Sequence, residues 1–199
     1  MKPSLPTMTV DPTILSGLES AVRTEWLVTN GLGGYASSTV WGVNTRKYHG
    51  LLVAALNPPV DRRVLLAKLD EEILLSSARF NLGISETKSK EQPQDIVSPC
   101  GFALAPLPTY AYSFAQGFQL KKTIFVPHEK NASIVLYEVV NGSCEKAKLS
   151  VSPLINCRDF HSVTDRNQIQ YNIKQENSGR LLFAQPSTSF PTLALFSTD

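Results

Sequence analysis

The chain has 199 residues, of which 42% are apolar and 18% are charged, and its formal net charge is +2. This length fits one large domain or two small ones, and charge is sparse against the roughly 25% usual for soluble domains. No window holds the dense Lys/Arg cluster of a nucleic-acid surface, so we expect no nucleic-acid partner. A surface covered by a partner and a merely less charged surface explain the sparse charge equally well.

Cysteine usage and hydropathy indicate the compartment. Cys100, Cys144 and Cys157 are odd in number and far apart, which argues against a disulfide framework or a zinc site and suits a reducing compartment. The N-terminus lacks the apolar core of a signal peptide. Residues 96–120 carry no charge, but three prolines interrupt them, so they cannot form an uninterrupted spanning helix. We predict a cytoplasmic protein with no membrane partner, no metal and no cofactor.

Helix signals are confined to the N-terminal end of the chain. Residues 11–24 predict one short helix, because Asp11 can cap it and Pro12 suits its first turn. Ile14, Leu15, Leu18 and Val22 share a face at helical spacing.

Strand signals dominate the rest of the chain. Residues 168–175 alternate between apolar and polar, which predicts a strand with one solvent-exposed face. Residues 49–56 and 132–140 are apolar on both faces and predict interior strands. Further strands are expected at 119–126, 147–155, 180–184 and 192–197, with turn-forming residues between them.

One segment fits two interpretations. Residues 62–77 have helical spacing and also alternate, with only Glu71 out of place on the apolar face. We favour a strand because residues 76–83 resemble a following hairpin. About ten short strands predict an all-β chain, an antiparallel β-sandwich or barrel with one short N-terminal helix. We expect a single domain over residues 1–199, with residues 85–95 as a long exposed loop.

A glycine-rich stretch follows an expected strand, and Gly31, Gly33 and Ala36 have the spacing of a dinucleotide-binding loop. Such a loop must open a helix, but residues 36–45 are rich in β-branched residues and form a poor helix. No acidic residue stands about twenty positions on to hold a ribose. We therefore expect Gly31, Gly33 and Gly34 to form a tight, exposed bend between two strands. An ordinary structural turn is an equally weighted reading of these glycines.

A polar and aromatic cluster, NTRKYHG, directly precedes the expected strand at 49–56. Along a strand, Arg46 and Tyr48 would point one way and Lys47 and His49 the other. Planar donors suit sugar hydroxyls and aromatic rings suit sugar faces, so this cluster is of the type that binds sugars.

Residues 25–72 as a block resemble the opening of the bacterial and archaeal glycogen debranching enzymes of the amylo-α-1,6-glucosidase type. Residues 149–162, with Arg158, Asp159, Phe160 and His161, resemble a second stretch of the same domain. The resemblance spans nearly the whole chain and is weakest at residues 1–20 and 85–95.

The resemblance implies an N-terminal β-sandwich, supersandwich-like, that precedes a helical (α/α)₆ toroid, and this chain would stop before the toroid. In that family the toroid hydrolyses α-1,6-linked glucose at branch stubs of glycogen and holds the acid and base carboxylates. The expected partners are therefore the chain's own catalytic domain and α-glucan, and a homodimer is an open alternative. The residues expected at the substrate-binding or domain-interface surface are Asn30, Gly31, Gly33, Gly34, Tyr35, Asn44, Arg46, Tyr48, His49, Arg158, Asp159 and His161.

The chain alone has poor prospects for hydrolysis, which needs two carboxylates facing one sugar bond. Asp70, Glu71 and Glu72 supply three acids together, but such a charge run usually marks a solvated edge. Asp159 between Arg158 and His161 is better read as an ion-paired strut. We expect no catalytic residue in this chain. Three functions remain: an accessory domain of a debranching glucosidase, a structural or oligomerisation module, and a stand-alone glucan-binding module.

Overall fold

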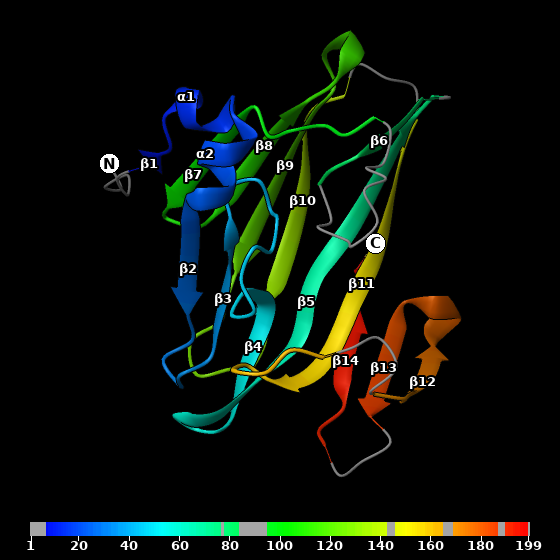
Figure 1. Ribbon diagram of the computed structural model, residues 1–199. Helices are drawn as coiled ribbons and strands as arrows, with labels where there is room; N and C mark the ends of the chain where they lie inside the picture. Colours follow the sequence, from blue (N-terminus) through cyan, green and yellow to red (C-terminus); the bar gives the residue numbers. More distant parts are fainter. Residues whose placement is uncertain are drawn as a thin grey trace, which may run out of the picture.

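The computed structural model describes residues 7–76, 78–83, 95–142, 146–164, 169–186 and 190–198. These residues form an all-β fold with two short helices near the N-terminus, as Figure 1 shows. The elements in chain order are β1 (Met8–Thr9), α1 (Pro12–Leu15), α2 (Leu18–Arg23), β2 (Glu25–Thr29), β3 (Tyr35–Thr39), β4 (Gly50–Asn57), β5 (Val60–Leu75), β6 (Ala78–Asn81), β7 (Gly101–Ala105), β8 (Thr109–Ser113), β9 (Gln119–Phe125), β10 (Ile134–Asn141), β11 (Ala147–Asp159), β12 (Tyr171–Glu176), β13 (Leu181–Pro186) and β14 (Leu193–Phe196).

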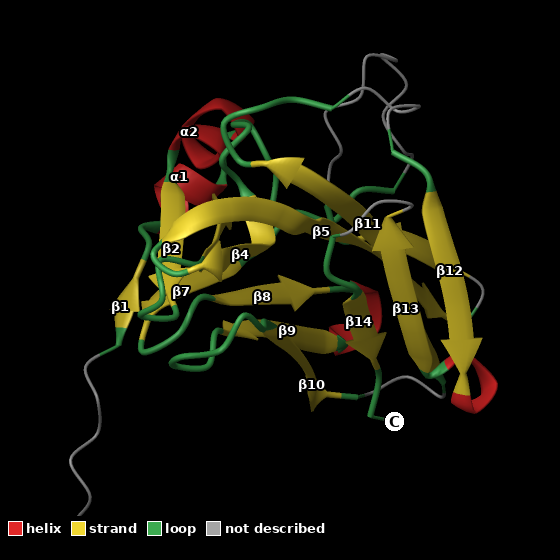
Figure 2. Ribbon diagram, turned by 90° about the horizontal axis from the view of Figure 1, so that it is seen from below, coloured by secondary structure: helices red, strands yellow, loops and turns green. Residues whose placement is uncertain are grey.

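The strands form three sheets, and every pair of named strands is antiparallel. The first sheet has the order β1-β7-β8-β9-β10, and the second has the order β11-β5-β4-β3-β2 with β6 paired to β5. The third is a small sheet, β12-β13-β14. Figure 2 shows the first two sheets as two layers, with the third sheet beside them. The predicted antiparallel β-sandwich is therefore confirmed.

The core lies between the two larger sheets, where aromatic side chains from both layers meet. The Trp26 indole N–H donates to the Tyr110 hydroxyl at 2.6 Å, and that hydroxyl donates to the Thr39 carbonyl at 2.7 Å. Phe102 packs edge-on against Tyr110 with 4.8 Å between ring centroids. Burial of one such apolar ring stabilises the fold by about 2–3 kcal/mol, and the buried polar tips are hydrogen-bonded as a core requires.

The helical region departs from the prediction of one helix. Asp11 caps α1 as expected, with its carboxylate accepting from the Thr13 backbone N–H at 2.8 Å, and Pro12 stands in the first turn. The helix ends after one turn, and a second helix begins after Gly17, whose extended backbone interrupts the helical path. Leu18 is consequently exposed instead of sharing the buried face with Leu15.

Most of the predicted strands are present. Residues 62–75 lie in β5, a single long strand followed by β6, so the strand interpretation of this ambiguous segment is confirmed. Residues 49–56 form the buried interior strand β4, also as predicted. The strands expected at 119–126, 147–155, 180–184 and 192–197 correspond to β9, β11, β13 and β14. The strand predicted at 168–175 begins at Tyr171, and the loop expected at 85–95 lies outside the described residues except for Asp95.

Two predictions about burial are wrong. The segment predicted at 132–140 forms β10, which spans Ile134–Asn141 and has largely exposed side chains. Within the described ranges it pairs only with β9 and so is an edge strand. Glu71, expected at a solvated edge, is buried between the sheets. Its carboxylate lies 2.6 Å from the Lys122 ammonium and accepts a hydrogen bond from the Tyr137 hydroxyl. Asp70 and Glu72, its neighbours on the opposite face of β5, are exposed to 44% and 37%, which agrees with the expected edge.

Candidate functional site

The glycine-rich stretch turns a corner between two antiparallel strands. Thr29 at the end of β2 pairs with Tyr35 at the start of β3, so residues 30–34 form the bend, and no helix follows it. Asn30 is buried and organises the bend: its side-chain oxygen accepts from the backbone N–H groups of Leu32 and Gly34 at 2.9 and 3.0 Å. The predicted bend is confirmed, and this geometry excludes the dinucleotide-loop interpretation, which needs a helix N-terminus.

Close approach explains why the bend uses glycine. Gly31 and Gly33 have φ values of 80° and 94°, a region that other residues enter only with strain. A Cβ atom on Gly33 would lie 2.6 Å from the Pro59 carbonyl oxygen, and one on Gly31 would lie 2.7 Å from the His128 ring. The bend is therefore packed against the two neighbouring turns and is less exposed than expected.

Residues 44–49 form a loop between β3 and β4, and the strand expected from residue 49 begins at Gly50. A turn at 46–49 closes with a hydrogen bond from the His49 N–H to the Arg46 carbonyl at 3.0 Å. Asn44 braces the loop: its amide donates to the Ala67 carbonyl at 2.8 Å. The side chains of this loop therefore do not alternate as those of a strand would.

Arg46 and His49 meet at the same carboxylate. The Arg46 Nε donates to the Glu25 carboxylate at 2.5 Å, and His49 Nε2 lies 3.6 Å from the same oxygen. His49 is 3% exposed, and its Nδ1 accepts from the Thr45 N–H at 3.1 Å, so the neutral ring carries its proton on Nε2. Burial lowers the pKa of His49 below its ordinary value, against a smaller opposing effect of Glu25. Arg46, by contrast, keeps 64% of its side chain exposed.

Arg158 joins the second motif to the first. Its guanidinium donates to the Lys47 carbonyl and, at 2.8 Å, to the Ser162 carbonyl. The Lys47 ammonium donates in return to the His161 carbonyl at 2.6 Å. Partial burial lowers the pKa of Arg158. These bonds tie the loop at residues 44–49 to the end of β11, although more than a hundred residues of chain separate the two.

Aromatic rings lie over this junction. The Tyr48 ring is 5.5 Å from the Phe160 ring and 5.7 Å from the His161 ring, and the Tyr48 hydroxyl lies 3.3 Å from His161 Nδ1. The Arg62 guanidinium lies over the Phe160 ring, 4.5 Å from its centroid. Beneath them, the Tyr35 hydroxyl donates to the Tyr48 carbonyl at 2.9 Å, and burial raises the pKa of Tyr35. We call the exposed part, made of Arg46, Lys47, Tyr48 and His161, the motif surface.

The structure divides the predicted site residues into two sets. Asn30, Gly31, Gly33 and Gly34 belong to the bend, whose contacts are with residues of the neighbouring turns, among them Asn131, which accepts from the Asn30 amide at 3.2 Å. The residues of the two motifs come together at the junction: Tyr35, Asn44, Arg46, Tyr48, His49, Arg158, Asp159 and His161. Asp159 acts locally, because its carboxylate accepts from the His161 backbone N–H at 2.8 Å.

Sequence reasoning missed three participants in the junction. Glu25 was not among the predicted site residues, because its role in holding Arg46 depends on pairing across β2, β3 and the loop. Lys47 belongs to the first motif, and its position next to Arg46 could have indicated that it is part of the site. Phe160 lies between two predicted residues, so its inclusion required only that the whole motif be taken as a unit.

The described residues offer little for metal or acid–base chemistry. They contain no group of three or more His, Cys, Asp or Glu side chains placed to hold a metal ion. The acidic groups near the junction, Glu25 and Asp159, are engaged with Arg46 and a backbone N–H. None of the helices in the described ranges has the length and apolar character needed to cross a membrane.

Comparison with known proteins identifies the family of this chain. The profile of the family described as glycogen debranching enzyme N terminal matches residues 24–199. The chain belongs to this family. No curated protein and no solved structure is significantly similar to it.

The match places the bend, the loop at residues 44–49 and the end of β11 within one debranching-enzyme N-terminal domain, while β1 and most of the helical region precede it. In this debranching-enzyme domain the cations of the junction mostly hold the fold, since Arg158 and Lys47 donate to backbone carbonyls. The side chains that retain exposed polar or aromatic surface are those of the motif surface.

Proposed function

We propose that this chain is the accessory N-terminal domain of an enzyme that hydrolyses α-1,6-glucosidic branch points in glycogen or related α-glucan. The family match over residues 24–199 carries this proposal. The domain packs on a C-terminal catalytic toroid, which supplies the acid and base carboxylates. The motif surface approaches the mouth of the active site, and the domain alone does not hydrolyse glycosidic bonds.

The build of the motif surface supports this role. Three separate elements hold it in place: Glu25 of β2 pairs with Arg46, Tyr35 of β3 bonds the Tyr48 carbonyl, and Arg158 of β11 bonds the Lys47 carbonyl. A surface that contacts substrate must be held rigidly by the residues behind it. An exposed guanidinium beside an exposed phenol ring offers planar donors for hydroxyl groups and a flat apolar face for a sugar ring.

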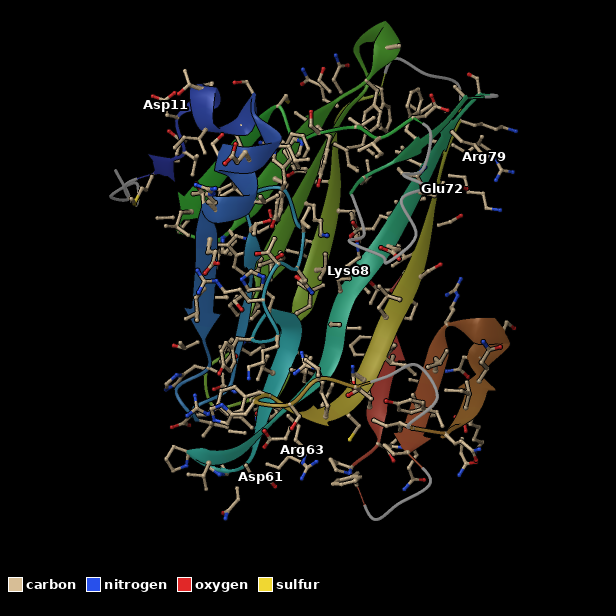
Figure 3. All side chains as sticks on the ribbon, in the orientation of Figure 1. Asp11, Asp61, Arg63, Lys68, Glu72 and Arg79 are labelled. Atoms are coloured by element: carbon tan, nitrogen blue, oxygen red, sulfur yellow. The ribbon has the colours of Figure 1, made fainter. Side chains whose placement is uncertain are left out.

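Substitution of Arg46 in a full-length enzyme that carries this domain tests the proposal. We expect Arg46→Ala to lower kcat/KM on a branched dextrin by about tenfold or more, the loss associated with one charged hydrogen bond. Arg79→Ala is the matched control: Arg79 is 70% exposed and also pairs with a carboxylate, that of Glu72, at 3.5 Å. Figure 3 shows Arg79 and Glu72 at the opposite end of β5 from Asp61 and Arg63.

A structural or oligomerisation module is the second candidate, because Lys47 and Arg158 already donate to carbonyls within the domain. This alternative predicts that Arg46→Ala leaves kcat/KM unchanged while it lowers the thermal midpoint or the association state of the full-length enzyme. Normal kcat/KM and normal stability together would remove the role of Arg46 at the active-site mouth.

A further inference from the structure

The outward face of the third sheet carries an aromatic residue, Phe196 of β14, at a position where the alternation of the strand predicts a polar residue. In β14, Leu193 and Leu195 face the core and Ala194 and Phe196 face outward. Phe196 is 74% exposed. Single exposed apolar residues are common on protein surfaces, so exposure alone says little. What distinguishes Phe196 is the hollow in which it lies.

This hollow has a volume of about 710 Å³ and is lined by Asn177, Ser178, Arg180, Leu181, Phe196 and Ser197. The hollow is open to solvent, because all of its lining residues except Leu181 are exposed. Like ligand sites, it combines an apolar wall with a few polar groups. The lining here follows that combination, with one aromatic ring, one aliphatic side chain and four polar side chains. Figure 1 shows β12, β13 and β14 together in the orange-to-red part of the chain.

Backbone hydrogen bonds fix the rim of the hollow before any ligand arrives. The turn between β12 and β13 closes with the Arg180 N–H donating to the Asn177 carbonyl at 3.2 Å. The Ser197 N–H donates to the Arg180 carbonyl at 3.0 Å and so ties the end of β14 to that turn. Leu181 pairs directly with Phe196 across the strands, and such neighbours on one face of a sheet contact each other. The ring therefore has a supported side and an open side.

The chemistry of the lining selects a neutral, hydroxyl-rich ligand. Amide and hydroxyl groups both donate and accept, which matches the hydroxyl groups of a sugar. Arg180 is the only charged residue among the six that line the hollow. A site for phosphate or carboxylate would need more positive charge, and an apolar ligand would cover the Asn177, Ser178 and Ser197 side chains without bonding them.

We propose that this hollow is a glucan-binding subsite, in which the open face of Phe196 stacks on a glucose ring and the polar rim bonds its hydroxyls. The choice of α-glucan over other sugars rests on the proposed function of the family. The subsite belongs to the third sheet and is separate from the motif surface, which belongs to the loop at residues 44–49 and the end of β11. It would hold a distant part of a branched polymer while a branch point is hydrolysed elsewhere.

Calorimetric titration of the 199-residue chain with maltoheptaose tests this subsite. We expect saturable binding at millimolar sugar, and we expect Phe196→Ala to weaken it about tenfold, or about 1.4 kcal/mol. Phe125→Ala is the matched control, because Phe125 is a partly exposed phenylalanine at the end of β9. Asn177→Gly should also weaken binding, since glycine keeps the positive φ of 50° at this position but removes the amide.

The outcomes separate this proposal from the function of the domain. Flat titrations, equal affinity of the Phe196→Ala and wild-type chains, or equal affinity for cellohexaose and maltoheptaose would each overturn the subsite. In the full-length enzyme, Phe196→Ala should raise KM for glycogen but leave kcat/KM on a short branched oligosaccharide unchanged. An enzyme that does not debranch any substrate contradicts the proposed function and leaves the binding result on the chain standing. If the alanine variant unfolds, perturbation of the Phe196 and Asn177 resonances in the wild-type chain by maltoheptaose decides the question.

Discussion

At the scale of single residues, the buried carboxylate of Glu71 has the largest expected effect on stability. Between the two sheets, this carboxylate forms an ion pair with the Lys122 ammonium at 2.6 Å and accepts a hydrogen bond from the Tyr137 hydroxyl. Removing one partner of such a pair leaves an uncompensated charge in the interior. We expect Lys122→Met to lower the free energy of unfolding by about 3 kcal/mol or more, as measured by urea denaturation.

A double variant separates the charge effect from lost packing. Glu71→Leu combined with Lys122→Met removes both charges, so we expect it to cost clearly less than the sum of the two single changes. Lys174→Met is the surface control, because the Lys174–Glu176 pair is solvent-exposed at 2.6 Å and should leave stability nearly unchanged. If the stability loss of the double variant equals the sum of the two single losses, Glu71 and Lys122 are not energetically coupled.

His49 gives the domain a predicted pH dependence of stability. Burial lowers its folded-state pKa from 6.5, Glu25 opposes this shift and Arg46 adds to it. Below pH 6.5 His49 of the unfolded chain binds a proton that His49 of the folded chain binds only at lower pH. The contribution of His49 to the free energy of unfolding is therefore fully present above pH 6.5 and declines as the pH falls. The slope contributed by one group is at most about 1.4 kcal/mol per pH unit.

Thermal denaturation of wild type and His49→Asn between pH 7.5 and 5, a range set around the ordinary value of 6.5 for this side chain, measures this contribution. Asparagine keeps an acceptor for the Thr45 N–H but cannot take up a proton. We expect the wild-type midpoint to fall more steeply than that of the variant on acidification. Parallel curves would show that His49 does not titrate differently in the two states.

At the scale of elements, the bend at residues 30–34 depends on two separable properties of glycine. Gly33 has φ of 94°, and a Cβ there would lie 2.6 Å from the Pro59 carbonyl oxygen. Gly179 has φ of 88°, but no atom in the described part of the chain lies within 4 Å of an added Cβ. We expect Gly179→Ala to cost about 1 kcal/mol for the backbone alone, and Gly33→Ala to cost at least about 2 kcal/mol.

Gly83→Ala completes this series, because Gly83 has no positive φ and no atom of the described residues lies within 4 Å of an added Cβ, so this position should tolerate alanine. Chemical denaturation of the three variants measures the free energy of unfolding that each one loses, and so ranks them. Equal losses for Gly33→Ala and Gly179→Ala would mean that the contact with the turn at Pro59 relaxes without cost.

Elements with local signals were predictable from the sequence, and those decided by distant partners were not. The bend followed from clustered glycines before β-branched residues, and β5 followed from alternation and a hairpin. The position of β10 at an edge could not be predicted, since apolar composition does not determine which strands become neighbours. The burial of Glu71 depends on Lys122 and Tyr137, which come from strands of the other sheet.

The candidate site shows the same division. Both motifs were found in the sequence, because each is a compact run of polar and aromatic residues. Their meeting through Arg158 and the Lys47 carbonyl was not deducible, because it requires the end of β11 to lie beside the loop before β4. The orientation of the side chains at residues 44–49 was not deducible either, because the turn closed by His49 and Arg46 prevents the alternation that a strand would give.

At the scale of the whole molecule, β10 presents a long free edge. Among the described residues it pairs on one side only, with β9, where every residue of the strand except Val140 has a partner, and the other side leaves backbone N–H and C=O groups available. Leu136 is 55% exposed, Val139 is 53% exposed, and no proline or lysine interrupts the strand. Exposed apolar edges of this kind pair with other chains unless charge or a bulge blocks them. Along β10 the devices of this type are Glu138 and a register shift between Val139 and Asn141, near the end of the strand.

The chain should therefore self-associate through β10 at high concentration, and charge placed on this strand should prevent it. We expect Leu136→Lys to shift the sedimentation coefficient distribution toward monomer at concentrations where the wild-type chain associates. Val163→Lys is the control, because Val163 is 78% exposed but lies outside the strands, so the same change of charge there leaves the edge intact. If both lysine variants associate less to the same extent, net charge governs association. If neither does, the edge of β10 is not the contact.

Because the β10 edge, the motif surface and the third sheet involve different residues, a Leu136→Lys chain should retain both the binding of maltoheptaose and the contacts of Arg46.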